Sequence, residues 1–272
     1  MERVMDAEKK AVHDFWEKAS CGESQFLPAT EREGYLQQLQ VRYELEPYIV
    51  DFADFPSTRG KRVLEIGVGL GADHQKFAAA GAVLCGIDLT YRAVEHSKCR
   101  FRLFGLESNL QQGDAENLPF KEGYFDLVYS WGVLHHTPDM IEAIKEIHRV
   151  LKPGGELKLM IYHKYSFVGF MLWARYALLK LKPMTSLADI YSRYLESPGT
   201  KAFSVKEAEE LFKNFRELKI TTILSYGDLL EGAVGQRHTG LMLTAAKLIW
   251  PRSLISKLFG RYGLNLLIRA KK

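Results

Sequence analysis

Short apolar runs alternate with segments of helical periodicity between residues 62 and 162. The runs are typical of strands buried on both faces in a parallel sheet, where side chains need not alternate between apolar and polar. The segments between them repeat apolar residues three or four apart, which indicates amphipathic helices. We expect strands at 62–66, 82–88, 109–112, 125–129 and 156–162, and helices at 72–80, 91–104 and 138–150. This alternation predicts right-handed crossovers and a doubly wound α/β sheet with helices on both faces.

The segments that flank this alternation have a different pattern. Residues 6–19 and 31–53 are predicted to be helical, with Pro47 breaking the second helix. After the fifth strand, 165–183 is an apolar helix with basic residues interspersed, and 248–261 repeats that character. The first two helices are placed to form a lid, and the later segments are insertions.

A glycine-rich turn ends the first strand and starts the next helix. Glu65 is followed by Gly67, Gly69 and Gly71. Glycine tolerates positive φ and lets a ligand approach the backbone, while the helix N-terminus offers free N–H groups. Such a turn binds nucleotides or nucleotide-like cofactors. Because residues 67–72 also fit the dinucleotide pattern G-x-G-x-x-A, an NAD(P)-dependent oxidoreductase remains an alternative.

Several further motifs carry a resemblance to a known family. They are Glu65-x-Gly67-x-Gly69-x-Gly71, Gly86-Ile87-Asp88-Leu89, Gly113-Asp114-Ala115-Glu116-Asn117-Leu118-Pro119-Phe120, Phe125-Asp126-Leu127-Val128 and Val133-Leu134-His135-His136. Over about residues 60–163 the chain resembles the class I S-adenosylmethionine-dependent methyltransferases, in particular the small-molecule group. The resemblance implies S-adenosyl-L-methionine as cofactor. It also implies a Rossmann-like seven-stranded sheet, mostly parallel with an antiparallel last strand, in which 215–224 and 263–269 are strands six and seven.

With that resemblance the chain divides into four parts. They are an N-terminal helical lid at 1–58, a cofactor-binding Rossmann-like core at 59–164, a helical insertion at 165–203, and a C-terminal completion of the sheet at 204–272 that contains an insertion at 226–261.

The resemblance also implies roles for individual residues. Glu65 and the backbone of Gly67, Gly69 and Gly71 would hold the methionine part of the cofactor, and Asp88 its ribose hydroxyls. Leu89, Asp114 and Ala115 would contact the adenine, and Ser130 and Trp131 would border the sulfonium.

Histidines near the ends of strands four and five are the candidates for acid–base chemistry. We expect His135 and His163 to be catalytic, with His163 facing the same opening as Tyr162. Three histidines in one place also raise the question of a metal, but no carboxylate or cysteine at a suitable spacing completes a ligand set, so we predict no metal site. Candidate substrate contacts are Tyr43, His136, Tyr162, Arg237 and His238.

Charge is distributed unevenly along the chain. Residues 1–163 have 19 Lys+Arg against 25 Asp+Glu, and residues 164–272 have 18 against 8. The basic second part favours a hydrophobic or anionic small acceptor, or peripheral membrane contact through 165–183 and 248–261. A non-enzymatic cofactor-binding protein at a membrane surface is therefore a second alternative. Nucleic acid is disfavoured because His135-His136-Thr137-Pro138 stands where base-methylating enzymes have Asn/Asp-Pro-Pro-aromatic.

Cysteine usage and the first residues bear on the compartment. Three scattered cysteines are too few for a disulfide framework, and residues 1–10 lack the apolar segment of a secretory signal. We expect a cytoplasmic protein that can be peripheral at the membrane, and we leave its oligomeric state and the acceptor's nucleophilic atom (oxygen, nitrogen, sulfur or carbon) open.

Overall fold

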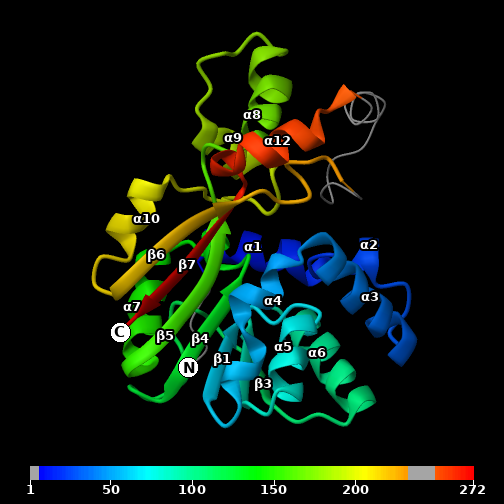
Figure 1. Ribbon diagram of the computed structural model, residues 1–272, viewed down its shortest axis with the longest axis vertical. Coiled ribbons are helices and arrows are strands. Elements are labelled where there is room, and N and C mark those ends of the chain that lie inside the picture. Colours follow the sequence, from blue (N-terminus) through cyan, green and yellow to red (C-terminus); the bar gives the residue numbers. More distant parts are fainter. Residues whose placement is uncertain (1–5, 232–248) are drawn as a thin grey trace.

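The computed structural model describes residues 6–231 and 249–272 and is built around one seven-stranded sheet (Figure 1). The strand order is β3-β2-β1-β4-β5-β7-β6, in which β7 is antiparallel to both of its neighbours and the other pairs are parallel. The doubly wound sheet with an antiparallel last strand is thus confirmed. The strands are β1 Arg62–Ile66, β2 Val83–Asp88, β3 Asn109–Gln112, β4 Phe125–Trp131, β5 Leu151–Tyr162, β6 Arg216–Ile223 and β7 Asn265–Lys271.

Several strand boundaries differ from those expected. β4 continues to Trp131, because Ser130 and Trp131 still pair with β5. β5 begins at Leu151, which pairs with Phe125 of β4. Residues 152–155 interrupt this pairing, and it resumes in a shifted register at Glu156. β7 begins two residues later than expected, at Asn265. The amide of the preceding residue, Leu264, donates to the Asp228 carboxylate at 2.7 Å and so is not available to the sheet.

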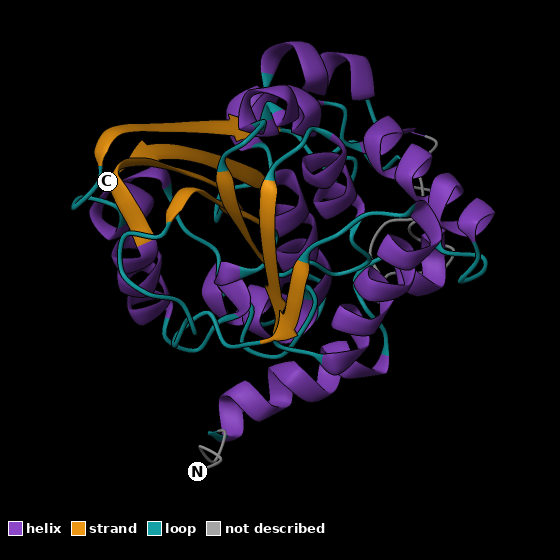
Figure 2. Cartoon of the chain, turned by 90° about the horizontal axis from the view of Figure 1, so that it is seen from below, coloured by secondary structure: helices purple, strands orange, loops and turns teal. Residues whose placement is uncertain are grey.

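Helices cover both faces of the sheet, as Figure 2 shows. One buried apolar cluster joins Leu64 to α7 and α10, and another joins Val63 to α4, α5 and α6. Neighbouring residues of β1 therefore pack on opposite faces, as expected for a strand buried on both sides. The helices are α1 Ala7–Lys18, α2 Glu23–Phe26, α3 Arg32–Leu45, α4 Tyr48–Ala53, α5 Ala72–Ala79, α6 Tyr91–Phe104, α7 Met140–Val150, α8 Phe167–Trp173, α9 Leu187–Tyr194, α10 Val205–Leu211 and α12 Arg252–Leu258.

Helices α8, α9 and α12 lie above the carboxyl ends of the parallel strands (Figure 1). Pro47 separates α3 from α4, as expected from its missing N–H. A π-helical turn, Ala174–Leu178, follows α8 directly. α8 and α9 share an apolar cluster of their own that includes Tyr191, and Phe167 of α8 contacts the aromatic rings of Trp250 and Phe259 beside α12. Among the described helices none has the length and apolar character to span a bilayer.

Candidate active site

A cavity of about 300 Å³ lies where the loops after β1, β2, β3 and β4 meet the helices above them. The lower wall comes from these loops. The upper wall comes from α1, α3 and the insertions, through residues such as Trp16, Arg42 and Glu196. Carboxyl ends of parallel strands are where ligands bind in open α/β sheets, because loops from several strands converge there.

The glycine turn after β1 is shaped by two glycines with different surroundings. Gly67 has φ 82°, and a Cβ there would lie 2.1 Å from Cγ2 of Val133, so no other residue fits without displacing the β4 loop. Gly69 has φ 50° and no heavy atom within 4 Å of the corresponding position, because its side faces the cavity. Gly71 is the N-cap of α5, packs against Ser97 and does not line the cavity.

Asp88 ends β2 and lines the cavity beside this turn. One carboxylate oxygen accepts from the Gly69 amide at 3.1 Å, and the other accepts from the amide and hydroxyl of Thr90 at 3.0 and 2.8 Å. Burial raises the pKa of Asp88, while these hydrogen bonds oppose the rise. Leu89 follows in the cavity wall.

Asp114 and Ala115, after β3, also line the cavity. Oδ1 of Asp114 accepts from the Glu116 amide at 2.9 Å, and Oδ2 accepts from Nζ of Lys9 at 2.7 Å. Lys9 belongs to α1 and also pairs with Glu116, so α1 is tied to the β3 loop.

Glu65 is buried in the cavity floor and bonded to a buried histidine. Its Oε2 lies 2.9 Å from Nδ1 of His74, and Nε2 of His74 lies 2.7 Å from the Ser108 hydroxyl. Burial raises the pKa of Glu65 well above its ordinary value and lowers the pKa of His74 to about 3. Burial therefore favours the uncharged form of both groups.

Asp73, at the start of α5, lines the cavity and joins three elements, α3, α5 and β4. Its carboxylate receives two bonds from Arg42 of α3 at 2.8 and 2.6 Å, and single bonds from the hydroxyls of Tyr43 and Tyr129 at 2.9 and 2.8 Å. Burial alone would raise the pKa of Asp73, but the Arg42 charge and these bonds lower it. Tyr43 was expected to contact the substrate. Its hydroxyl instead donates to Asp73, and the residue does not line the cavity.

Two residues at the end of β4, Ser130 and Trp131, were expected to border the sulfonium, and one of them lines the cavity. Trp131 lines it and packs against the rings of Tyr48 and Phe52. Ser130 is fully buried and donates to the Ile66 carbonyl at 3.0 Å, because neighbouring strand residues point to opposite sides.

The three histidines lie in different environments. His136 lines the cavity. His135 is fully buried behind it, stacked on the Tyr162 ring at 3.8 Å, and burial lowers its pKa well below the ordinary value. His163 is buried outside the cavity and bonds the Gly263 carbonyl through Nδ1 at 3.1 Å. The expectation that His163 and Tyr162 face the same opening is wrong, since only Tyr162 lines the cavity and β5 alternates its side chains.

The upper part of the cavity contains residues that the sequence did not single out. Tyr162 donates to Glu196 at 2.8 Å, and Glu196 follows α9 in the insertion. Cys21, an exposed residue with a free thiol, also lines this part. No local motif marks these residues, because they come from segments far apart in the chain: Trp16, Cys21, Glu46, Glu196, Tyr226 and Asn265. The expected substrate contacts Arg237 and His238 lie outside the described residues.

Comparisons with known proteins match the chain to methyl-transferring enzymes. A family model described as a methyltransferase domain matches residues 64–159. The norajmaline N-methyltransferase of Rauvolfia serpentina is 35% identical over 112 residues, which are 40% of this chain and 38% of that protein. The ubiquinone biosynthesis O-methyltransferase of Aromatoleum aromaticum is 30% identical over 145 residues, 52% of this chain and 62% of that one. The chain spans about half the length of the curated relatives it matches.

A solved structure extends the likeness beyond the matched domain. An S-adenosylmethionine-dependent methyltransferase from Methanosarcina mazei is similar over 83% of this chain and 97% of its own, with a TM-score of 0.54 and 20% identity. At that identity the likeness establishes the fold.

Proposed function

Since the chain belongs to the class I S-adenosylmethionine-dependent methyltransferases, we propose that it transfers a methyl group from S-adenosyl-L-methionine to a small organic acceptor. The observation that carries the proposal is the cavity itself. Its lower wall contains the glycine turn, Asp88 and Asp114. The upper part of the same cavity has a mostly apolar lining, and we call it the acceptor chamber. A cofactor and an acceptor thus have adjoining places in one enclosed space.

The lower wall is suited to the cofactor residue by residue. Gly67 and Gly69 bring the backbone close to the methionine part, and Glu65 lies next to them to receive its amino group. Asp88 would bind the ribose hydroxyls. Leu89, Asp114 and Ala115 would contact the adenine, and Trp131 would border the sulfonium end, since all five line the cavity. Gly71 and Ser130 act indirectly in this scheme, because each shapes the turn without lining the cavity.

The upper wall favours an apolar acceptor that offers a hydrogen-bond donor. It carries the carboxyl groups of Glu46 and Glu196, while the two Lys or Arg side chains in the described lining, Lys9 and Arg42, are already paired with carboxylates. A carboxylate-lined apolar wall receives hydroxyl, amine or thiol groups and repels anions. An anionic acceptor would depend on Arg237 and His238.

Chemistry at the acceptor end would be limited to alignment and proton removal, because the sulfonium cofactor already activates the methyl group. His136, Tyr162 and Glu196 form the polar edge of this end. We place the acceptor's nucleophile against that edge. His135 and His163 lack cavity surface, so any influence they have on catalysis would be through the residues they pack against.

The insertions support peripheral contact with a membrane surface. Leu181 and Met184 are 90% and 95% exposed, next to Lys180 and Lys182, and Leu258 beside Lys257 continues this apolar and basic character on α12. Apolar side chains flanked by lysines suit the interface of an anionic bilayer. The insertions also form the roof of the acceptor chamber through Val168 and Leu195, so a hydrophobic acceptor could enter from the lipid.

Two measurements test the proposed function. Calorimetric titration with S-adenosylhomocysteine should give one site per chain, and Asp88→Asn should weaken it by about tenfold or more, because bonds between a charged carboxylate and ribose hydroxyls contribute about 1.5–3 kcal/mol. Asp51→Asn, an exposed site on α4, is the control and should bind as the wild type does. Unchanged affinity in Asp88→Asn would contradict the proposed pocket.

Labelled-cofactor turnover with a panel of phenols, amines, thiols, carboxylates and quinol-like lipids then identifies the acceptor. We expect activity with an apolar, uncharged acceptor. Binding without turnover on every class would favour the non-enzymatic alternative.

A further inference from the structure

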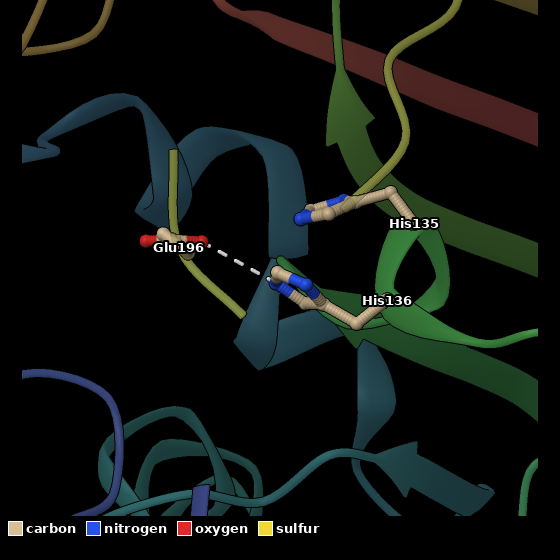
Figure 3. A group of neighbouring side chains, drawn as sticks. All are labelled: His135, His136 and Glu196. Atoms are coloured by element: carbon tan, nitrogen blue, oxygen red, sulfur yellow. Dashed lines mark ion pairs between the residues drawn. The ribbon is translucent and has the colours of Figure 1, made fainter. Parts of the chain in front are cut away.

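We propose that His135, His136 and Glu196 bind one divalent transition-metal ion of the zinc type at the upper wall of the cavity. Figure 3 shows both imidazoles pointing toward the Glu196 carboxylate. One ligand atom from each residue lies within 4.8 Å of the others. Metal binding by these three side chains goes beyond methyl transfer and does not depend on it.

The two ring nitrogens of His136 have different surroundings. Nδ1 lies 2.9 Å from the Ser197 hydroxyl and 3.1 Å from the Thr200 hydroxyl. Nε2 is buried without a hydrogen bond among the described residues and lies 3.3 Å from Oε2 of Glu196. The hydroxyls thus hold the ring through Nδ1, and a deprotonated Nε2 can bind a cation together with the carboxylate.

His135 supplies a second nitrogen without a partner. Its side chain is fully buried, and neither ring nitrogen makes a hydrogen bond within the part of the chain that the structure describes. A buried polar group left without a bond costs about 1–3 kcal/mol. Coordination through one nitrogen would recover that energy, and stacking on Tyr162 holds the ring toward the cluster.

Tyr162 completes the cluster as a second layer. Its hydroxyl donates to Oε2 of Glu196 at 2.8 Å, which orients the carboxylate. Outer partners of this kind position metal ligands and tune their basicity. Because His136 and Glu196 also line the cavity, the open coordination positions would face the acceptor chamber.

The ligand set selects the kind of ion. Two imidazoles and one carboxylate form the open zinc site of hydrolytic enzymes, whereas Mg²⁺ and Ca²⁺ prefer oxygen ligands alone. Ligand atoms about 2.1 Å from a zinc ion lie at most about 4.2 Å apart. Modest side-chain rotations would bring the three atoms into range.

The test uses the full chain, stripped with a chelator and dialysed. Zinc is then added and counted by elemental analysis, and its affinity is measured by competition with a chromogenic chelator. We expect one zinc per chain, an affinity at least tenfold weaker in Glu196→Gln and in His136→Gln, and wild-type affinity in His13→Gln. The control histidine lies on α1, where it is half-buried beside Asp14 and Glu17. No uptake, or equal loss in the control, would overturn the site; no uptake is also the result expected if a proton on His136 alone pairs with Glu196.

Two readouts separate metal binding from folding and from the proposed function. Co²⁺ in place of zinc should give a visible absorption band in the wild type and in His13→Gln, and the band should be absent in His136→Gln. Melting temperature and S-adenosylhomocysteine affinity of each variant are measured alongside. Zinc binding without cofactor binding would contradict the methyltransferase proposal alone, and cofactor binding without zinc binding would contradict the metal site alone.

Discussion

At the scale of single residues, hydrogen bonds determine the protonation of Glu65 and His74 in the lower wall of the cavity. The Ser108 hydroxyl donates to the Leu84 carbonyl at 3.0 Å, so it must accept from Nε2 of His74. Nδ1 of the neutral ring then accepts, and the partner that donates is a protonated Glu65. Geometry and pKa directions agree that the folded pair holds one proton.

This shared proton predicts a pH dependence of stability with two slopes. In the unfolded chain Glu65 titrates near 4.5 and His74 near 6.5, whereas in the folded chain the pKa of His74 is about 3 and that of Glu65 is raised. Below pH 4.5 the unfolded pair binds two protons and the folded pair one, so stability falls as pH falls toward 3. Above pH 6.5 the unfolded pair binds none, so stability falls as pH rises until Glu65 ionises. The contribution is therefore largest between pH 4.5 and 6.5.

Urea unfolding from pH 3 to pH 8 measures these slopes. Each unmatched proton contributes at most about 1.4 kcal/mol per pH unit to the free energy of unfolding. Glu65→Gln should abolish the decline above pH 6.5 relative to the wild type, because the amide cannot ionise. A decline of the same steepness in both proteins would show that other groups cause it.

At the scale of elements, the bonds to Asp73 join α3 to the core. Arg42 belongs to α3, Tyr129 to β4 and Asp73 to α5; Tyr129 and Asp73 are buried and Arg42 is partly exposed. The Lys9 bonds to Asp114 and Glu116 tie α1 to the loop after β3. The N-terminal helices α1 and α3 thus reach the lower wall of the cavity through charges that compensate one another.

Breaking this junction should destabilise the protein strongly. Asp73→Asn leaves Arg42 with only Glu46 at 3.7 Å as a charged partner, and we expect a loss of about 3 kcal/mol in the free energy of unfolding, because removing one member of a buried pair exposes the other to an uncompensated environment. Glu142→Gln, which breaks the exposed pair with Lys145 on α7, should leave the urea midpoint nearly unchanged. Similar midpoints for the two variants would contradict the junction.

At the scale of the whole molecule, the net positive charge lies in the second part of the chain, which also exposes several apolar side chains. Residues 164–272 carry 18 basic against 8 acidic side chains, and the insertions that contain Leu181 and Met184 rise above the carboxyl ends of the strands (Figure 1). A membrane on that side would face the roof of the acceptor chamber.

Vesicle co-sedimentation tests this orientation. We expect binding to anionic vesicles and weak binding to neutral ones, and the double variant Leu181→Asp/Met184→Asp should bind anionic vesicles about tenfold less, since it loses apolar contact and gains negative charge. Ile141→Asp, which adds one negative charge at an exposed position of α7, should bind as the wild type does. Equal binding to neutral and anionic vesicles, or an equal loss in the control, would argue against a membrane face here.

Local signals account for what could be predicted of the fold. The glycine turn, the break at Pro47 and the five alternating strands depend on neighbours in the sequence, and the structure has them where they were expected. Predicted strand ends were wrong where contacts with distant residues set them. The bond from Leu264 to the Asp228 carboxylate moves the start of β7, and pairing with β5 extends β4 to Trp131. Ser204 and Glu207 form a capping box, which is a local sequence signal for the start of α10.

Local patterns in the sequence predicted the strands of the sheet and the turn residues that meet at its edge, because the carboxyl ends of parallel strands lie side by side there. Only the tertiary structure decided which side chains share the acceptor chamber. Glu196 meets His136 and Tyr162 because the insertion folds back over the cavity, and His163 is turned away because β5 alternates its sides. Such contacts depend on how separate segments pack, and no local spacing in the chain encodes them.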